Sequence, residues 1–415
     1  MKDNQAKYPQ LRFKGYSDAW VQRKLGENAT ILTGGTPKTT EPSYWEPKEI
    51  PWMSSGEVNK KRLESTDNMI SEIGLENSSA RWVKEHSILI ALAGQGKTRG
   101  MVAINNIPLT TNQSIAAIEP NESLDYEFVF QNLGNRYDEL RMSSSGDGTR
   151  GGLNKKIISD ILVSAPDIDE QKQIGKLFAS LDNLIAANQR KLDLLKEQKK
   201  GYLQKMFPKN GAKVPELRFA GFADDWEERK LSDLFIKGGS GGTPKSTNKA
   251  FYDGDIPFLS ISDITKSNGF INNTEKHISS DGLNSSAAWI VSKGAISLAM
   301  YASVGKLAIL NIDAATSQAF YNMIFDDYDL RDLVYQRLNK ANELSEWNKL
   351  ISTGTQSNLN ADKVKNFQMY LPKNHDEIKL ISTFFQQLDN TIALHQRKLD
   401  LLKEQKKGFL QNMFV

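Results

Sequence analysis

Two long stretches of the chain place apolar residues at helical spacing. In both, the apolar side chains recur every three or four residues and occupy two positions of a heptad. The first stretch holds Phe178, Ile185, Leu192, Lys199 and Met206 at one position, and Leu181, Asn188, Leu195 and Tyr202 at the other. The second stretch holds Phe385, Ile392, Leu399, Lys406 and Met413, and Leu388, His395, Leu402 and Phe409. The pattern predicts two long amphipathic helices whose apolar seams pack on each other.

Polar residues interrupt both seams, at Asn188 and at His395. Residues of this kind commonly fix the register of paired helices rather than add stability. We therefore interpret both as interface residues, and for His395 we prefer this role to that of a ligand. An antiparallel pairing would relate the two ends by a pseudo-twofold axis. Each helix of about 35 residues would be about 50 Å long, which is the reach of about 15 base pairs.

The two seams belong to an internal duplication of the whole chain. QRKLDLLKEQKKGYLQKMF at 189–207 recurs 207 residues later as QRKLDLLKEQKKGFLQNMF at 396–414, with 17 of 19 positions identical. PQLRFKGYSDAWVQRKL at 9–25 recurs as PELRFAGFADDWEERKL at 215–231, and GGTPK occurs at 34–38 and 241–245. Gly96-Lys97 pairs with Gly305-Lys306, and a GT–LN segment at 148–154 pairs with one at 354–360. A period this long, repeated twice, predicts two domains of one design, each followed by one helix.

The globular parts mix short apolar runs with loops rich in Gly, Ser, Thr and Asn. Residues 87–93, 295–302, 157–163 and 364–371 predict strands, and residues 125–140 and 330–344 predict helices. The predicted fold class is α+β: two similar globular α/β-mixed domains, each followed by a long helix, with the helices forming an antiparallel coiled coil of pseudo-twofold symmetry. The predicted limits are 1–168 and 209–375 for the domains, and 169–208 and 376–415 for the helices.

Composition narrows the function classes only modestly. The 415 residues carry a net charge of +3 and no cysteine, which excludes disulfides, thiolate metal sites and a cysteine nucleophile. The polar N-terminus shows no signal core, and the longest apolar run, 88–93, is far too short to cross a bilayer. We expect a cytoplasmic protein with no membrane partner.

One local motif suggests nucleotide chemistry. ALAGQGKT at 91–98 misses the phosphate-loop pattern G-x-x-x-x-G-K-[ST] only at its first glycine. Against this, the second copy has Leu307 where the first has Thr98, and the apolar run at 101–104 predicts a hairpin instead of the helix that would cradle a phosphate. An NTPase built on Lys97 therefore remains an alternative, as does a purely structural coiled-coil scaffold. The four histidines are scattered, so we predict no metal site and no catalytic residue.

The repeated loops carry hydroxyls, amides and single cations. Arginine favours guanine edges, whereas Asn and Gln favour adenine. Turn chemistry also favours several of these residue types, and for any one of them that alternative stays open. As a set that differs between the halves, they predict contacts to DNA by Thr36, Lys38, Thr39, Gln95, Lys97, Thr98, Arg99, Arg150 and Asn154 in the first half, and by Thr243, Lys245, Ser246, Ser303, Lys306, Gln356 and Asn358 in the second.

These features together resemble the specificity (S) subunit of bacterial type I restriction–modification enzymes. The resemblance rests on the near-identical QRKLDLLKEQKKG helices, the PELRFxGF–W entry segments, the GGTPK loops, the G-K turns and the GT–LN segments, in the order domain–helix–domain–helix over essentially the whole chain. It implies that each domain is a target recognition domain reading one half of a bipartite sequence in double-stranded DNA.

The resemblance also implies the partners and cofactors. The paired helices would set the spacer and dock two modification subunits, which would bind S-adenosylmethionine and methylate one adenine in each half. Two restriction subunits would add translocation and cleavage driven by ATP and Mg²⁺. The chain itself would carry no cofactor and act as a non-catalytic recognition subunit.

Overall fold

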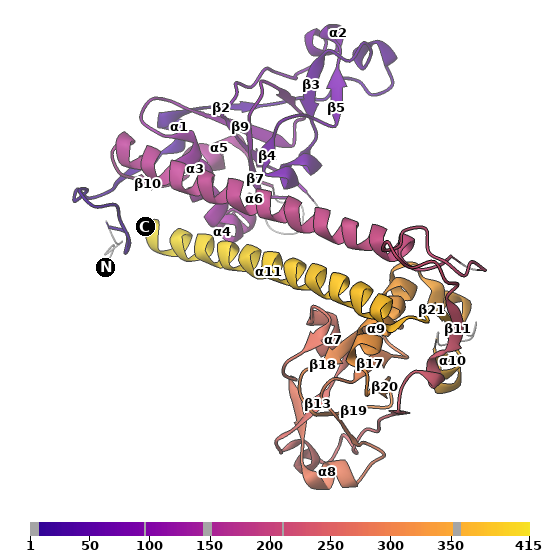
Figure 1. The fold of residues 1–415 in the computed structure, drawn as a ribbon. Coiled ribbons are helices and arrows are strands. Elements are labelled where there is room, and N and C mark those ends of the chain that lie inside the picture. Colours follow the sequence, from indigo (N-terminus) through magenta and orange to yellow (C-terminus); the bar gives the residue numbers. More distant parts are fainter. Residues whose placement is uncertain (1–7, 95–96, 144–151, 210, 352–357) are drawn as a thin grey trace. The chain divides into compact units, whose positions relative to one another are not determined.

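The computed structural model describes residues 8–94, 97–143, 152–209, 211–351 and 358–415. The chain forms two units, one made of residues 1–187 and 399–415 and the other of residues 188–398 (Figure 1). Each unit therefore contains one globular part and a portion of both long helices. None of the helices in these described ranges is long and apolar enough to cross a membrane.

The globular part of the first unit is built on two small sheets. The larger sheet has the order β2-β9-β6-β7-β4, the smaller the order β5-β3-β8, and β1 pairs with β10. The strands are β1 (Val21–Lys24), β2 (Ala29–Thr33), β3 (Ile50–Met53), β4 (Arg62–Leu63), β5 (Asn68–Ile70), β6 (Ile88–Ala91), β7 (Val102–Asn105), β8 (Thr110–Thr111), β9 (Ile115–Pro120) and β10 (Leu162–Ala165). The helices are α1 (Leu25–Asn28), α2 (Glu72–Glu76), α3 (Tyr126–Asn135), α4 (Tyr137–Met142) and α5 (Lys155–Asp160), with 3-10 turns η1 (Pro42–Tyr44) and η2 (Ser55–Lys60).

The second unit repeats this topology, with one further strand, β16, in the smaller sheet. Its larger sheet has the order β12-β20-β17-β18-β14, its smaller sheet the order β15-β13-β19-β16, and β11 pairs with β21. The strands are β11 (Glu227–Lys230), β12 (Lys237–Ser240), β13 (Ile256–Leu259), β14 (Phe270–Ile271), β15 (Lys276–Ile278), β16 (Ile290–Val291), β17 (Ile296–Ala299), β18 (Leu307–Leu310), β19 (Ala314–Thr316), β20 (Phe320–Ile324) and β21 (Gln368–Leu371). The helices are α7 (Ile261–Lys266), α8 (Ser280–Asn284), α9 (Tyr328–Glu343) and α10 (Ala361–Lys365), with 3-10 turns η3 (Leu231–Asp233), η4 (Lys249–Tyr252) and η5 (Glu346–Lys349).

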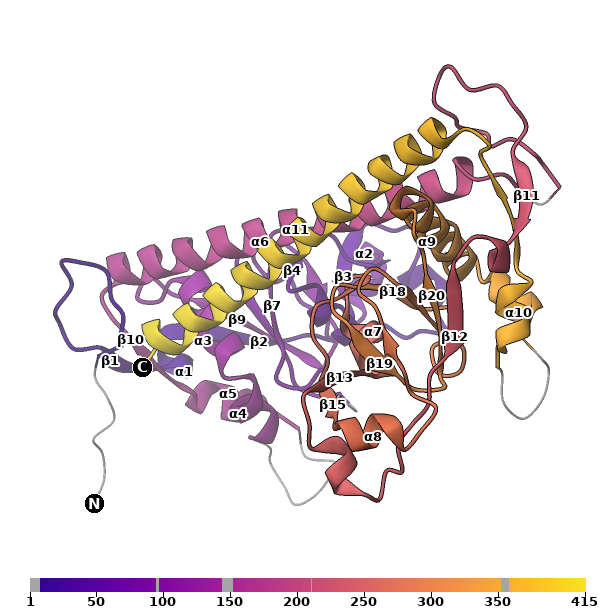
Figure 2. The same cartoon turned by 60° about the horizontal axis from the view of Figure 1, so that its bottom comes forward.

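Two long helices follow the globular parts, α6 (Ile168–Lys205) and α11 (His375–Met413), with 38 and 39 residues. Figure 2 shows both from a second direction. Their apolar faces belong to the cores of the units: Phe178 and Met413 are buried in the core of the first unit, and Met206 and Phe385 in that of the second. The predicted fold class, two similar mixed α/β domains each followed by a long helix, is confirmed.

The central strands predicted from apolar runs are also confirmed, whereas two others are partly wrong. Strands β6 and β17 lie inside 87–93 and 295–302, and α3, α4 and α9 match the helices predicted at 125–140 and 330–344. The runs 157–163 and 364–371, however, begin as the short helices α5 and α10 before β10 and β21. Asn154 and Asn360 cap these helices through their side-chain oxygens, so a helical turn precedes each strand.

Candidate nucleic-acid interface and paired helices

In the first unit the beginning of α6 packs on the end of α11. The rings of Phe178 and Phe414 lie 5.7 Å apart. Four residues further along α6, Asp182 forms an ion pair of 2.5 Å with Lys406 of α11. Contacts that advance along α6 retreat along α11, so the two helices are antiparallel within this unit.

The second unit builds the same junction from the other ends of the helices. Lys199 of α6 forms an ion pair of 2.6 Å with Asp389 of α11. Just beyond the end of α6, Phe207 lies 6.0 Å from Phe385, measured between ring centroids. Here too the pairing is antiparallel. The lysines that interrupt the heptad seams are thus each paired with a carboxylate on the facing helix.

The residues expected in the seam have low exposure. Phe178, Leu181, Asn188, Leu192, Leu195, Phe385 and Leu399 are buried, whereas Ile185, Tyr202, Leu388, Ile392, His395, Leu402 and Phe409 are half-buried. The Nδ1 atom of His395 is enclosed and has no hydrogen-bond partner among the described residues. Asn188, by contrast, is engaged in an interaction.

Each seam carboxylate is also tied to its own globular part. The amide of Gln131 in α3 donates to Asp182 at 2.9 Å, and that of Gln336 in α9 donates to Asp389 at 2.7 Å. In the first unit Arg62 adds a bond of 3.1 Å to Asp182. Burial acts to raise the pKa of Asp182, but Lys406, Gln131 and Arg62 outweigh it, so the pKa lies below its ordinary value.

The PELRF segments fasten the globular parts to the helices. Arg12 makes a two-pronged pair with buried Glu170 near the start of α6, with both N–O distances 2.7 Å, and Arg218 makes the same pair with Glu377 near the start of α11. Two-pronged pairs between a guanidinium and a carboxylate fix orientation as well as distance. The repeated arginine is therefore a structural clamp.

The GGTPK loops pass very close to the strand that faces them. A Cβ on Gly34 would lie 2.0 Å from the carbonyl oxygen of Thr111, and one on Gly241 would lie 1.8 Å from that of Thr316. The next amide donates to the same carbonyl in both units, from Gly35 at 2.8 Å and from Gly242 at 3.0 Å. Only glycine permits this approach, which explains why both copies carry the pair.

The threonine of each GGTPK loop holds a glutamine that sequence reasoning missed. The hydroxyl of Thr36 donates to the side-chain oxygen of Gln113 at 2.5 Å, and that of Thr243 donates to Gln318 at 2.6 Å. Both glutamines are exposed. The signal in the sequence is the spacing T-x-Q, which occurs at 111–113 and 316–318 and is separated by one residue from β9 and β20.

The remaining loop residues of the GGTPK segments are presented to solvent. Lys38, Thr39, Lys245 and Ser246 are exposed, whereas the prolines beside them are buried. Indole Nε1 of Trp45 donates to Lys38 O at 3.3 Å in the first unit, and in the second the Tyr252 hydroxyl donates to Pro244 O at 2.7 Å. The smaller sheet and α2 in one unit, and the smaller sheet and α8 in the other, lie away from the long helices of their own unit (Figure 1).

The G-K turn aligns differently in space from the pairing expected. The amide of Gly100 donates to Ala91 O at 2.9 Å, and that of Gly305 donates to the equivalent Ala299 O at 3.0 Å. Gly305 therefore corresponds to Gly100, and φ is positive at both, 86° at Gly305 and 82° at Gly100. The expected pairing of Gly305 with Gly96 is wrong. The turn of the first unit is longer, and this insertion obscured the register.

The same turn argues against a phosphate loop. The strand β7 that follows β6 pairs with it antiparallel, as the expected hairpin. Among the described residues 91–94 and 97–105 no helix begins, so none of them offers Lys97 the helix N-terminus that would cradle a phosphate. Lys97 is exposed, Thr98 and Arg99 are half-buried, and the Tyr137 hydroxyl donates to Lys97 O at 2.5 Å.

In the second unit the turn meets the long helices. Exposed Ser303 adopts φ 58°, and Lys306 lines a cleft of about 420 Å³ together with Lys200 of α6 and Tyr335 of α9. The structure thus places Lys306 beside the helix pair.

In the first half, Asn154 caps α5. Asn358 is half-buried outside any helix or strand, and Gln95, Arg150 and Gln356 lie outside the described residues.

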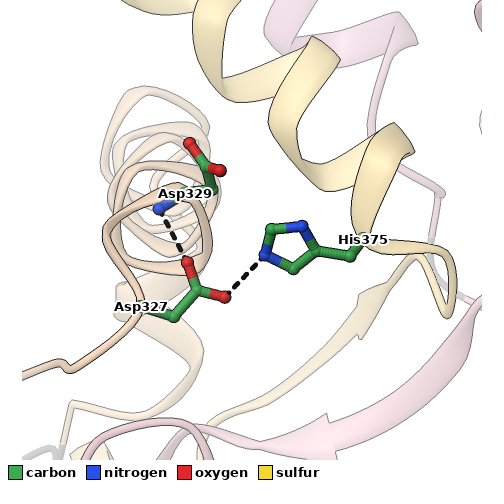
Figure 3. Close-up of side chains that lie close together, drawn as sticks. All are labelled: Asp327, Asp329 and His375. Atoms are coloured by element: carbon green, nitrogen blue, oxygen red, sulfur yellow. Dashed lines mark hydrogen bonds and ion pairs between the residues drawn. The ribbon is translucent and has the colours of Figure 1, made fainter.

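One cluster in the second unit carries metal-ligand residue types. Oxygens of Asp327 and Asp329 and a nitrogen of His375 lie within 4.8 Å of one another (Figure 3). Asp327 already accepts from the amides of Asp329 and Leu330, as the N-cap of α9, and lies 2.9 Å from His375 Nε2. Burial acts to raise its pKa, but the Leu330 amide and His375 outweigh it and lower the pKa. Helix capping accounts for this cluster.

Comparison with known proteins points to one family. A family model described as "Type I restriction modification DNA specificity domain" matches residues 17–197 and again 223–404. The chain is 24% identical over 340 residues to the type I restriction enzyme MjaVIII specificity subunit of Methanocaldococcus jannaschii, covering 79% of this chain and 78% of that protein. It is 26% identical over 187 residues to the EcoR124I/EcoR124II specificity subunit of Escherichia coli, covering 44% of this chain but only 46% of that relative.

A solved structure extends the likeness to the fold. The S subunit of a type I restriction–modification system from M. genitalium shares 12% identity and a TM-score of 0.67, over 98% of this chain and 99% of that one. At this identity the likeness shows a common fold. The family model matches twice, over the two halves that the structure repeats. The chain therefore belongs to the type I restriction modification DNA specificity family, as a specificity subunit with two copies of the domain.

Proposed function

We propose that each globular part reads one half of a bipartite sequence in double-stranded DNA, while the paired helices set the spacer between the halves. The observation that carries this proposal is the repeated presentation of polar loops on one scaffold. Both units present the loop after the glycine pair to solvent, with Lys38 and Thr39 in one and Lys245 and Ser246 in the other. The scaffold is shared, whereas the turns and side chains around it differ, as two readers of unlike sequences require.

The helices also dock two copies of one modification subunit. The seam explains only some of the 17 identical positions, because Leu194 and Leu401 are identical in the repeat yet 52% and 56% exposed. A single exposed leucine is ordinary on a protein surface. The same leucine at equivalent points of two helices, each flanked by the same charged residues, supplies two equal surfaces for two equal partners.

The chemistry then belongs to the partners. Each modification subunit binds S-adenosylmethionine and methylates one adenine, which it takes out of the base stack. Two restriction subunits bind ATP and Mg²⁺. A pseudo-twofold relation between the readers would match the dyad of duplex DNA, so that two half-sites are read at a fixed separation. This chain contributes recognition and assembly, and no catalytic residue.

The direct test is to co-express the chain with its modification subunit and map methylated adenines in the cell's DNA. We expect one motif made of two unlike halves with a constant gap. A chimera whose second globular part, 215–371, is replaced by a copy of 9–165 should methylate a motif whose halves match as an inverted repeat. A motif in one block, or a chimera that keeps the original second half, would contradict the proposal.

A further inference from the structure

The two units present one polar group in the same way. Gln113 and Gln318 are both exposed, and the side-chain oxygen of each accepts a hydrogen bond from the threonine of its GGTPK loop. Each glutamine lies two residues after the threonine whose carbonyl receives the Gly-Gly backbone. The structure records no bond to the amide nitrogen of either glutamine among the described residues, so two N–H donors face solvent.

The pose of these amides is held by rigid neighbours. The glycine pair brings the loop to hydrogen-bond distance of the strand that precedes each glutamine. The indole of Trp52 donates to Gly35 O at 3.0 Å, and the indole of Trp289 donates to Ser240 O at 3.0 Å in the second unit. A side chain held by such a frame loses little freedom when a ligand binds, which favours selective contact.

The anchored amide retains the chemistry that suits adenine. A carboxamide oxygen has two lone pairs, of which the threonine hydroxyl takes one. The other can accept from adenine N6–H while the amide nitrogen donates to N7, which is the two-point contact by which glutamine selects adenine in the major groove. The threonine sets which edge of the amide is offered.

What is shared by the two readers should recognise what is shared by the two half-sites. The side chains around the glutamines differ between the units: Thr39 is replaced by Ser246, and the turn after β6 is longer than the one after β17. The Thr–Gln pair does not differ. Under the proposed function, both half-sites contain an adenine to be methylated, so an A·T pair is common to them, and the glutamine contacts it in the intact duplex, before the modification subunit takes the base out of the stack.

We propose that Gln113 and Gln318 each contact an adenine at equivalent positions of the two half-sites, with Thr36 and Thr243 as positioning residues. This inference rests on the proposed function. It adds the identity of the residue that reads, in each unit, the A·T pair that the two half-sites share under the proposed function.

The test measures binding of the assembled chain and modification subunits to duplexes carrying the mapped target. Each A·T pair shared by the halves is replaced in turn with 7-deazaadenine, which lacks the N7 acceptor. We expect wild type to bind about tenfold more weakly to one such duplex per half-site. Gln113→Ala should weaken binding to the natural duplex by a similar factor and show no further loss on the duplex modified in its half. Gln318→Ala should do the same for the other half.

Controls separate contact from folding. Gln10→Ala, at an exposed glutamine outside the loop, should bind both duplexes as wild type does. Thr36→Val should weaken binding, whereas Thr36→Ser, which keeps the hydroxyl, should restore it. Thermal melting of each variant should match wild type, because the glutamines are exposed.

Three results would overturn the inference. Unchanged binding of both glutamine variants would do so. So would a glutamine variant that binds the natural duplex and the 7-deaza duplex more weakly than wild type by the same factor, because its contact then lies elsewhere, such as at a phosphate. In both cases wild type would still select its target, and the proposed function would stand. If wild type prefers no sequence at all, the proposed function fails and this inference fails with it.

Discussion

The two units hold equivalent seam carboxylates, Asp182 and Asp389, with different partners. Asp182 is held by Lys406 across the seam, by Gln131 from α3 and by Arg62 from β4, and Arg62 is in turn paired with Glu127 at 2.5 Å. Asp389 is held by Lys199 and Gln336, and the strand β14 that corresponds to β4 begins with Phe270. The seam is therefore a shared element, whereas the attachment of each globular part to it is individual.

This difference teaches how a duplicated scaffold can diverge. Under the proposed function the helix surfaces serve equal partners, which accounts for their near-identical sequences, while the globular parts need only keep the bonds that hold them to the helices. An ionic network in one unit, and in the other Phe270 beside Gln336 and Asp389, both meet that need. The variants below disturb the comparison, beginning with the largest expected effect.

A charge placed in the seam should destabilise both units, and the loss of stability should differ between them more than for any other variant. Leu181 is buried, whereas the equivalent Leu388 is half-buried. We expect Leu181→Asp to lower the free energy of unfolding of the first unit by about 4 kcal/mol, and Leu388→Asp to lower that of the second by about 2 kcal/mol. Hydrogen exchange of peptides from each unit measures the two values separately. Equal losses would show that exposure does not govern the seam.

Loss of the seam carboxylate should be more costly in the first unit. Asp182→Ala leaves both Lys406 and Arg62 without that partner, so we expect a loss of about 3 kcal/mol. Asp389→Ala leaves only Lys199, and we expect about half as much. Chemical denaturation followed by hydrogen exchange tests the order. A greater loss from Asp389→Ala would contradict the network.

Lowering the pH should reduce the difference in stability between wild type and Asp182→Ala. The folded-state pKa of Asp182 is lowered, so its contribution is present above the ordinary carboxyl pKa and is lost as pH falls through the folded value. Stability of wild type and Asp182→Ala, measured from pH 7 downward, should converge at the acid end. Parallel curves would show that the charge of Asp182 does not matter.

A buried lysine should give the second unit its own response to alkali. Lys340 donates to Phe207 O and Pro208 O at 3.1 Å, and burial lowers its pKa to about 8. Between that value and its ordinary 10.5 the unfolded chain binds more protons, so stability rises with pH in this window. The free energy of unfolding of wild type, relative to that of Lys340→Met, should therefore rise from pH 8 to 10. A constant difference would contradict this.

The smallest effect is expected at the exposed loop cations. Lys38→Ala and Lys245→Ala should leave stability unchanged and weaken DNA binding a few-fold without altering the preferred sequence. Each should reduce the slope of log affinity against log salt by about 1, as loss of one phosphate contact does. A variant that changes the preferred sequence would place its lysine at a base edge.

The helices and the central strands could be predicted because their patterns are local. Seven-residue spacing identifies a seam, and a short run of apolar residues between turns identifies a buried strand. Lys199 and Lys406 occupy positions of that seam without an apolar side chain, and the heptad pattern does not say what they pair with. Their carboxylate partners, Asp389 and Asp182, lie on the other helix, about two hundred residues away in the sequence, and no spacing rule connects them.

The loop site could be predicted only in part. The repeated GGTPK motif indicated a shared constraint, which the close approach to Thr111 and Thr316 explains. Gln113 and Gln318 were missed because a single glutamine before a strand is unremarkable until a hydroxyl from a distant loop is seen to orient it. The short helices α5 and α10 were missed because their apolar residues run directly into a strand.

The central claim, that the paired helices fix the distance between two readers, has one direct test. One heptad is inserted into each long helix, after Ala187 in α6 and after Lys398 in α11, so that the seam stays in phase. Methylated adenines are then mapped with the modification subunit present. We predict that both half-sites remain unchanged and that the gap between them grows by roughly three base pairs, from about 10 Å of added helix. An unchanged gap in an active complex would contradict the account.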